Sequence, residues 1–358
     1  MTDRKRRMGI VVTSLMGAGT EKTILTLAES LAKEGCDVDL YILRHHCDYT
    51  PAEGVNCIWL NTTSNREARA KLTAEIQRRG VNYDLFVISN AKYFDAVPVT
   101  HKVCSLHITP TAWIQDGPKW KFWSRGRKLK NLRKKFRHKT VIALSGGIRN
   151  DLENNLGVPA SNVIEIVNPF DITQIREAAK EAGPIPEGRY IVSIASLNKR
   201  KRHADTIKAL VKIPQTDVSL VIVGRGKEEE SLRQLASDLD IVDRVIFWGW
   251  DANPYRLLRH ASVSVLASEA EGSPRALIES LLVGTPAVAS DCPSGPSEIL
   301  TGSLAPYLTP VGDIQALTNA IELALNTYPD IPSEIARRFD SAVVAKQYIQ
   351  LADSLSVD

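Results

Sequence analysis

The sequence of 358 residues lacks several features that would set it apart from ordinary globular proteins. No run of eighteen or more apolar residues occurs, so the sequence predicts no transmembrane helix. The five cysteines are scattered, odd in number and without C-x-x-C spacing, which argues against a disulfide framework or a zinc site and favours a reducing cytoplasm. No short-period repeat or low-complexity tract is visible either.

The first twenty residues, MTDRKRRMGIVVTSLMGAGT, imitate a signal peptide because a short apolar run follows a basic start. They lack a small-x-small cleavage site, and they lead directly into a helical pattern. We therefore predict that they contain a first buried strand.

Strand-like and helix-like segments alternate along the chain, which predicts an α/β fold with parallel sheets. The composition, with 44% hydrophobic and 24% charged residues, is typical of a soluble globular protein of two domains. We predict two Rossmann-like domains that face each other across a cleft, over residues 1–168 and 169–335. The helical stretch 336–358 is expected to pack back on the first domain. Such sheets bind ligands at the carboxyl ends of their strands.

Gly17 and Gly19 lie in MGAGTEKT, which opens a predicted helix after the first strand, where backbone N–H groups could hold an anion. A P-loop would need glycine directly before Lys22, and Glu21 stands there. A nicotinamide dinucleotide site would need a third glycine at Lys22 and an acid closing the second strand, which ends YILRHH. A simple reversing turn and a loop that approaches a substrate diphosphate both remain open.

Two glutamates stand eight residues apart in EGSPRALIESLLVGTP, with Glu271 before a predicted helix and Glu279 inside it. Ser273 suits the N-cap, Pro274 the first helical position, and Gly284 the end of the helix. Taken alone, the two carboxylates could be unrelated solvated side chains.

The start of this helix is a predicted anion site because its first N–H groups have no helical acceptor and the helix dipole favours negative charge. The residues that carry these groups are Arg275, Ala276 and Leu277. Carboxylates repel phosphate, but they accept hydrogen bonds from hydroxyls, each contributing about 1.5–3 kcal/mol. Two carboxylates beside an anion site therefore match the outline of a nucleotide sugar.

At this point the sequence resembles a known family. Glu271 and Glu279 match the E-x7-E motif of the family-4 retaining glycosyltransferases, which have the GT-B fold. The surrounding SEAEGSPRALIESLLVGTPAVASDCPSGPSEIL is similar to bacterial members that build surface polysaccharides. The resemblance extends over most of the chain, through VIFWGWDANPYRLLRHASVSVLAS, LVIVGRGKEEESLRQLA and VIALSGGIRNDLENNLGVPASNVIEIVNPFD.

The resemblance implies a role for each matching residue. Glu279 would bind the ribose hydroxyls, Glu271 the hydroxyls of the donor sugar, and Lys201 the diphosphate. His107 matches a first-domain histidine that lines the donor sugar. The other positions implied to line the nucleotide sugar are Gly17, Gly19, Ser196, Arg200, Gly224, Arg225, Trp248, Trp250, Ser273, Arg275, Ala276 and Leu277.

One position departs from the family pattern. The family usually carries an arginine five residues before the diphosphate lysine, and this chain has Ser196 there. Lys199 or Arg200 could supply the second phosphate cation, or the site could be weaker.

The resemblance also implies the chemistry: transfer of a hexose or N-acetylhexosamine from a nucleotide sugar, expected to be UDP-linked, to a lipid-linked or surface-polysaccharide acceptor. Retention of configuration is implied, with no metal and no cofactor besides the nucleotide sugar as co-substrate. No D-x-D stands at a strand end to hold a metal. A covalent intermediate would need a nucleophile, and none can be identified, which favours a same-face mechanism assisted by the leaving phosphate.

Two other classes of function remain as alternatives. A nucleotide-sugar epimerase of the same fold would act without an acceptor, and fold alone does not exclude it. A basic nucleic-acid-binding protein is a weaker alternative, and we expect no nucleic-acid partner; binding of RNA with a steep salt dependence would reverse this.

Residues 119–139, KWKFWSRGRKLKNLRKKFRHK, hold eleven Lys and Arg and no acid, while the whole chain carries only +4. Leu129, Leu132 and Phe136 would form an apolar stripe on a helix. The stripe could simply pack on its own domain. The alternative that we favour is an interfacial helix on an anionic membrane, which predicts a cytoplasmic protein, peripheral on the inner face of the cytoplasmic membrane. The predicted membrane contacts are Trp120, Trp123, Arg133, Lys134, Lys135 and Arg137.

Overall fold

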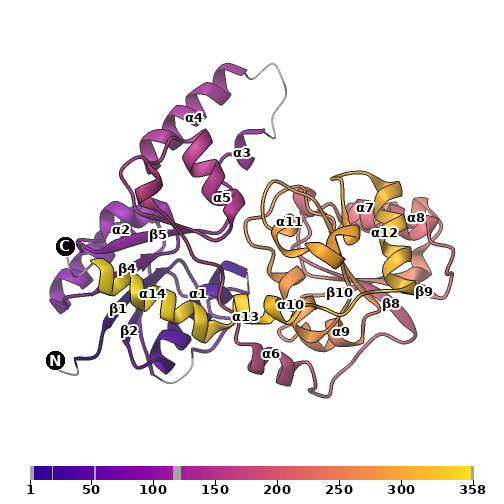
Figure 1. Cartoon of the computed structure of the whole chain (residues 1–358), viewed down its shortest axis with the longest axis horizontal. Coiled ribbons are helices and arrows are strands. Elements are labelled where there is room, and N and C mark those ends of the chain that lie inside the picture. Colours follow the sequence, from indigo (N-terminus) through magenta and orange to yellow (C-terminus); the bar gives the residue numbers. More distant parts are fainter. Residues whose placement is uncertain (1–3, 18, 52–53, 116–121, 356–358) are drawn as a thin grey trace. The chain divides into compact units, whose positions relative to one another are not determined.

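The computed structural model describes residues 4–17, 19–51, 54–115 and 122–355, and it divides into two compact units (Figure 1). The first unit comprises residues 1–171 and 337–358, and the second comprises 172–336. The boundaries predicted from the sequence were 168/169 and 335/336. Both units contain a parallel sheet flanked by helices, which confirms the predicted α/β class.

The sheet of the first unit has seven parallel strands in the order β3-β2-β1-β4-β5-β6-β7. The strands are β1 (Arg7–Val12), β2 (Asp37–Ile42), β3 (Val55–Trp59), β4 (Leu85–Ile88), β5 (Lys102–Leu106), β6 (Val141–Ala143) and β7 (Val163–Glu165). The strand β4, with the sequence LFVI, is buried along its whole length, as expected for a parallel strand covered on both faces. The N-terminal segment contains β1, which is buried from its second residue onward, so the predicted first buried strand is confirmed.

The helices of the first unit pack on both faces of this sheet. They are α1 (Gly19–Lys33), α2 (Asn65–Arg79), α3 (Ala112–Gln115), α4 (Phe122–Phe136), α5 (Gly146–Asn150) and α14 (Ser341–Leu355). The C-terminal helix α14 lies beside α1, with Tyr348 buried, and Asp353 accepts hydrogen bonds from the Arg6 guanidinium at 2.6 and 2.9 Å (Figure 1). The last helix of the chain thus completes the first unit.

The second unit has six parallel strands in the order β10-β9-β8-β11-β12-β13. They are β8 (Arg189–Ile194), β9 (Val218–Val223), β10 (Val245–Gly249), β11 (Val263–Leu266), β12 (Ala287–Ser290) and β13 (Leu308–Thr309). The helices are α6 (Ile172–Ala178), α7 (His203–Lys212), α8 (Glu229–Asp238), α9 (Tyr255–His260), α10 (Arg275–Val283), α11 (Pro296–Ile299), α12 (Ile314–Asn326) and α13 (Ser333–Phe339). The boundary between the two units falls within α13.

The strand order of the second unit reverses between β8 and β11. From β8 the chain proceeds outward to β9 and β10, and from β11 it proceeds the other way to β12 and β13. The loops after β8 and β11 therefore begin side by side, at the ends of neighbouring strands, and run in opposite directions along the sheet. A ligand site is expected at such a switch point.

The helix α10 begins one residue later than predicted. Pro274, with φ −73° and ψ 93°, is the N-cap residue, and no side chain caps the helix, so the assignment of Ser273 as N-cap is wrong. The reason is tertiary packing. The ring of Pro274 lies against Gly295, since a Cβ built on this glycine would be only 2.5 Å from Cδ of the proline. The helix ends at Gly284 as predicted, with a left-handed φ of 89°.

Candidate functional site

The loops after β8 and β11 bring together two of the predicted catalytic side chains. The Nζ of Lys201 lies 2.5 Å from Oε1 of Glu271, and the two side chains are only 17% and 11% exposed. The loops are joined by a backbone hydrogen bond from Glu269 N to Arg200 O, and the Asn198 side chain accepts from Lys201 N. An ammonium suited to phosphate and a carboxylate suited to sugar hydroxyls thus share one position at the switch point.

Glu279 lies on the second turn of α10 and is 8% exposed. Its Oε1 accepts a hydrogen bond from Nη2 of Arg275 at 2.8 Å and a longer one from the Tyr255 hydroxyl at 3.4 Å. Tyr255 comes from the start of α9, and the sequence analysis did not identify it. Only the packing of α9 against α10 places this hydroxyl near the carboxylate.

The start of α10 retains the properties of an anion site. The first backbone hydrogen bond of the helix runs from Ile278 N to Pro274 O, so the N–H groups of residues 275–277 have no acceptor within the helix. These groups stand between Glu271, which precedes the helix, and Glu279 on its second turn. The arrangement offers N–H donors to an anion and carboxylate acceptors to hydroxyls on either side.

Gly224, which follows β9, is fixed by a close approach to the loop after β8. It has a φ of 148°, and a Cβ at this position would lie 2.0 Å from the carbonyl oxygen of Ala195. Its N–H donates to Gly249 O at 2.8 Å. Only glycine fits here, so a substitution would displace the loop that leads to Lys201.

Arg225, Trp248 and Trp250, which the resemblance places along the nucleotide sugar, lie in the loop after β9 and at or just after the end of β10. The Arg225 guanidinium stacks on the Trp250 ring, 5.2 Å from its centroid, and Trp250 is 36% exposed. The indole N–H of Trp248 donates to Asp251 Oδ2 at 3.0 Å. Trp250 therefore presents an aromatic surface, whereas the Trp248 donor is already used within the protein.

The loop after β8 has no arginine at the position where the family carries one. Ser196 is exposed and accepts a hydrogen bond from the Asn198 amide at 2.8 Å. Lys199 is exposed, whereas Arg200 and Lys201 are half-buried. Lys201 is paired with Glu271.

His203, which was not singled out from the sequence, is a buried residue at the end of this loop, beside β8. It is 2% exposed, and its Nδ1 lies 3.1 Å from the hydroxyl of Ser193 on β8. Burial, together with the Lys201 ammonium, lowers the pKa of His203 to about 4. The imidazole is therefore neutral near pH 7. Its place two residues after Lys201 was the available sequence signal.

In the first unit, the loop that contains Gly17 does not present the N–H group of this glycine to a ligand. The N–H of Gly17 donates to Asp48 Oδ2 at 2.7 Å, so this group is not open to an anion as expected. Gly19 is the first residue of α1, and burial raises the pKa of the Glu21 carboxyl on the same turn. A phosphate at Gly17 would have to displace the Asp48 carboxylate, because like charges repel.

His107 directly follows β5 and is half-buried. The segment after it is anchored by Thr111, whose N–H donates to Asp151 Oδ2 at 3.0 Å and whose hydroxyl donates to Asp151 Oδ1 at 2.5 Å. The structure thus places His107 at the carboxyl edge of the first sheet, in a different unit from Lys201, Glu271 and Glu279.

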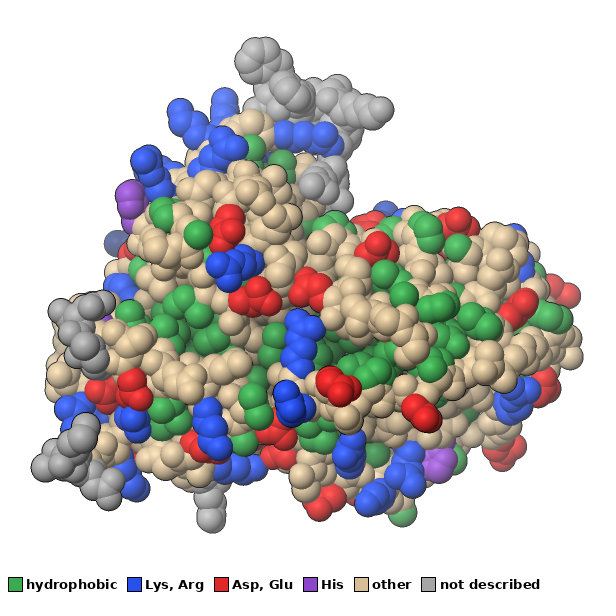
Figure 2. Space-filling model, viewed as in Figure 1, with side chains coloured by type: hydrophobic (Ala, Val, Ile, Leu, Met, Phe, Trp, Pro, Cys, Tyr) green, Lys and Arg blue, Asp and Glu red, His purple; other side chains and the backbone are tan. Residues whose placement is uncertain are grey.

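Residues 122–136 of the basic segment form the helix α4, and Lys and Arg side chains gather over it (Figure 2). Of its apolar stripe, Phe136 is buried at 3% exposure, and Leu129 and Leu132 are half-buried. Arg133 donates to Asn155 O at 3.1 Å from Nε and Nη2. The exposed cations of the helix and its end include Lys134, Lys135 and Arg137. Trp120 and the side chain of Trp123 lie outside the described residues.

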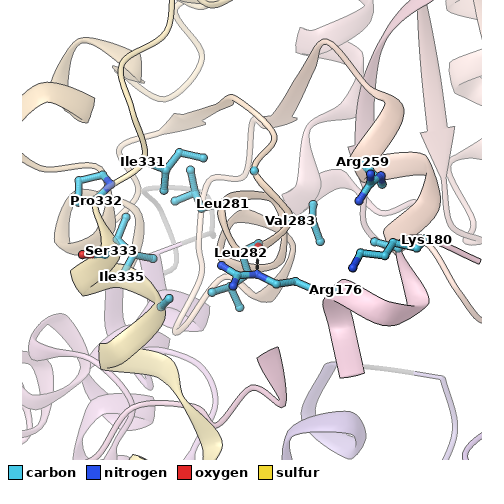
Figure 3. Close-up of a pocket in the computed structure, with 13 residues that line it drawn as sticks. Arg176, Lys180, Arg259, Leu281, Leu282, Val283, Ile331, Pro332, Ser333 and Ile335 are labelled. Carbon is cyan, nitrogen blue, oxygen red and sulfur yellow. Dashed lines mark hydrogen bonds between the residues drawn. The ribbon is translucent and has the colours of Figure 1, made fainter. Parts of the chain in front are cut away.

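A cavity of about 350 Å³ lies elsewhere in the second unit, at the carboxyl end of α10 (Figure 3). Its lining combines the cations Arg176, Lys180 and Arg259 with apolar residues such as Leu281 and Ile331. Arg176 Nε donates to Leu282 O at 3.0 Å, which satisfies a carbonyl at the helix end. None of the predicted site residues lines this cavity, so it is distinct from the site at the start of α10.

The described residues lack both a metal-binding cluster and a membrane-spanning helix. No group of three or more His, Cys, Asp or Glu side chains there could hold a metal ion. Within the same ranges, every helix is too short or too polar to span a bilayer.

Comparison with known proteins matches both units. The family described as "Glycosyl transferases group 1" matches residues 175–342, and "Glycosyltransferase Family 4" matches residues 17–174. The chain is 26% identical over 216 residues to N-acetylgalactosamine-N,N'-diacetylbacillosaminyl-diphospho-undecaprenol 4-alpha-N-acetylgalactosaminyltransferase of Campylobacter jejuni, covering 59% of each chain. It is 29% identical over 177 residues to lipopolysaccharide 1,6-galactosyltransferase of Escherichia coli, covering 48% of each. The matched part thus spans about half the length of these curated relatives.

The fold as a whole is similar to that of solved structures. The Anabaena protein HepE, crystallised in complex with UDP and glucose, superposes with a TM-score of 0.74 at 19% identity. The match covers 98% of this chain and 100% of that chain. The similarity therefore extends over both units.

Proposed function

The chain belongs to the family-4 glycosyltransferases of the GT-B fold, and on this premise we propose that it transfers a hexose or N-acetylhexosamine from a nucleotide sugar to a lipid-linked or surface-polysaccharide acceptor. The donor is a UDP-sugar. No cofactor is needed besides this co-substrate, and the reaction proceeds without a metal ion.

The observation that carries the proposal is the assembly at the start of α10. Lys201 contacts Glu271, which precedes α10, and Glu279 is buried on the second turn of that helix. A diphosphate held by Lys201 and the first N–H groups of α10 would place a sugar on the Glu271 side and a ribose on the Glu279 side. Oriented cations and N–H groups stabilise the charge that grows on a leaving diphosphate.

Names of relatives support the donor and acceptor classes. The Anabaena structure contains UDP and glucose, which motivates the choice of uridine. The Campylobacter jejuni relative is named for a diphospho-undecaprenol acceptor, and the Escherichia coli relative for lipopolysaccharide. We extend these classes to the present chain as part of the proposal.

We propose a retaining reaction in which the acceptor attacks on the face that the diphosphate leaves. The groups at the start of α10 accept hydrogen bonds from hydroxyls and donate hydrogen bonds to phosphate. No carboxylate there is assigned as a nucleophile. The leaving phosphate would take the proton from the acceptor hydroxyl, while Lys201 stabilises the departing charge.

The test is an initial-rate assay with UDP-hexoses and UDP-N-acetylhexosamines, with and without a polyprenyl-diphosphate-linked acceptor. We expect sugar transfer that needs the acceptor, persists in EDTA and gives an anomer of the donor's configuration by NMR. Release of free or epimerised sugar at the same rate without acceptor would instead identify an epimerase. Loss of turnover in EDTA, restored by a divalent ion, would exclude the metal-independent mechanism.

We further propose that α4 brings the enzyme to the inner face of the cytoplasmic membrane, where a lipid-linked acceptor would be found. Because Phe136 is buried, the contact would rest on the exposed cations, each contributing about 1 kcal/mol near an anionic surface. The chain should float with anionic liposomes, much less with neutral ones, and detach in high salt. Replacing Arg133, Lys134, Lys135 and Arg137 by Ser should abolish flotation but leave nucleotide binding intact. Equal recovery with both liposome types, or RNA binding of similar salt dependence, would contradict this assignment.

A further inference from the structure

The carboxylate of Glu279 is held asymmetrically. Its Oε1 accepts hydrogen bonds from Arg275 at 2.8 Å and from Tyr255 at 3.4 Å. No described residue donates a hydrogen bond to Oε2. One carboxylate oxygen is thus fixed by the protein, and the other remains available to a ligand at the start of α10.

The Arg275 guanidinium is well suited to this task. Arg275 lies one helical turn before Glu279, and the two side chains are only 11% and 10% exposed. A planar guanidinium holds a carboxylate in a defined orientation, and its charge offsets the cost of burying Glu279. The position is the first residue of α10, where the sequence analysis considered only the backbone N–H.

We propose that Arg275, assisted by Tyr255, is a positioning residue that orients Glu279 and thereby sets the preference for ribonucleotide over deoxyribonucleotide donors. This rests on the proposed function, because it takes Glu279 as the acceptor of the ribose hydroxyls. A carboxylate whose orientation is fixed binds a vicinal hydroxyl pair more tightly, because the conformational entropy of the carboxylate is lost on folding and not on ligand binding. A carboxylate free to rotate would lose this advantage.

The experiment measures dissociation constants by calorimetry for UDP and 2′-deoxy-UDP with the full chain. We expect wild type to prefer UDP by about 10- to 100-fold, the value of a hydrogen bond to a charged acceptor. Arg275→Met should lower this ratio to about threefold or less, and Arg275→Lys should give an intermediate value. The control is Arg149→Met, which removes another arginine that pairs with a glutamate four residues away, Glu153, at 2.9 Å. It should keep the wild-type ratio.

Each other outcome overturns the proposal in a recognisable way. If Arg275→Met weakens both ligands equally, Arg275 acts on the phosphates rather than through Glu279. If the ratio is unchanged in Arg275→Met, or in Arg275→Lys should the first variant fail to fold, Arg275 does not position the carboxylate. If wild type itself binds UDP without any preference over 2′-deoxy-UDP, the ribose role of Glu279 fails as well. Failure of the ribose role of Glu279 and failure of the positioning role of Arg275 therefore give different results.

Discussion

Glu271→Gln should strengthen the binding of UDP while it weakens catalysis. In the structure Oε1 of Glu271 lies 2.5 Å from Nζ of Lys201, and both side chains are less than a fifth exposed. If Lys201 is the diphosphate cation, the carboxylate competes with the ligand for the same ammonium. Glutamine keeps the shape of the side chain but removes the competing charge.

The size of the effect follows from this contact. A hydrogen bond to a charged group contributes about 1.5–3 kcal/mol. Lysine has three donor hydrogens and can keep part of this bond while it contacts a phosphate, so we take about 1 kcal/mol as the cost of sharing. This corresponds to a gain of about fivefold in UDP affinity. Transfer from a UDP-sugar should fall by about 10- to 100-fold, because the acceptor of the sugar hydroxyls is weakened.

Calorimetry with UDP and initial rates with a UDP-sugar separate the two effects. Glu269→Gln is the control, since Glu269 lies in the same loop but faces Arg202, at 3.7 Å, and should change neither quantity by more than about twofold. A folded Glu271→Gln variant that binds UDP more weakly than wild type would refute the competition. Unchanged turnover would refute the assignment of Glu271 to the sugar.

Three further predictions concern neighbouring residues. Glu279→Ala should weaken nucleoside diphosphate binding by about 1.5–3 kcal/mol in calorimetry, and unchanged affinity in a folded variant would remove the ribose assignment. Lys201→Ala should cut turnover strongly whereas Lys199→Ala should be mild, and the reverse order in initial-rate assays would shift the diphosphate cation to Lys199. The lowered pKa of His203, about 4, means that the unfolded chain binds one more proton from about pH 6.5 down to pH 4. Urea denaturation should show the free energy of unfolding falling as the pH drops through this window, and His203→Gln should flatten the fall.

Local sequence patterns were sufficient for the fold class and for the motif around α10. The strand β1 and the helix α1 follow from a short apolar run and a periodic segment, and Gly284 ends α10 because a left-handed residue there favours glycine. The edge strand β3 is half-buried or exposed at every position, so its pattern in the sequence is weak. Strands covered on both faces are easier to recognise than edges.

The sequence by itself determined that Glu271 and Glu279 lie at the start of one helix, because their spacing and the flanking proline and glycine are local features. Only the tertiary structure decided which side chains meet them. Lys201 lies 70 residues from Glu271, and the two meet because the strand order places β8 beside β11. The Tyr255 hydroxyl reaches Glu279 only through the packing of α9 on α10. In the same way, Asp48 accepts the N–H of Gly17 from a loop 31 residues away. Such contacts depend on which chain segments the sheet brings together, and no spacing within a single segment specifies that.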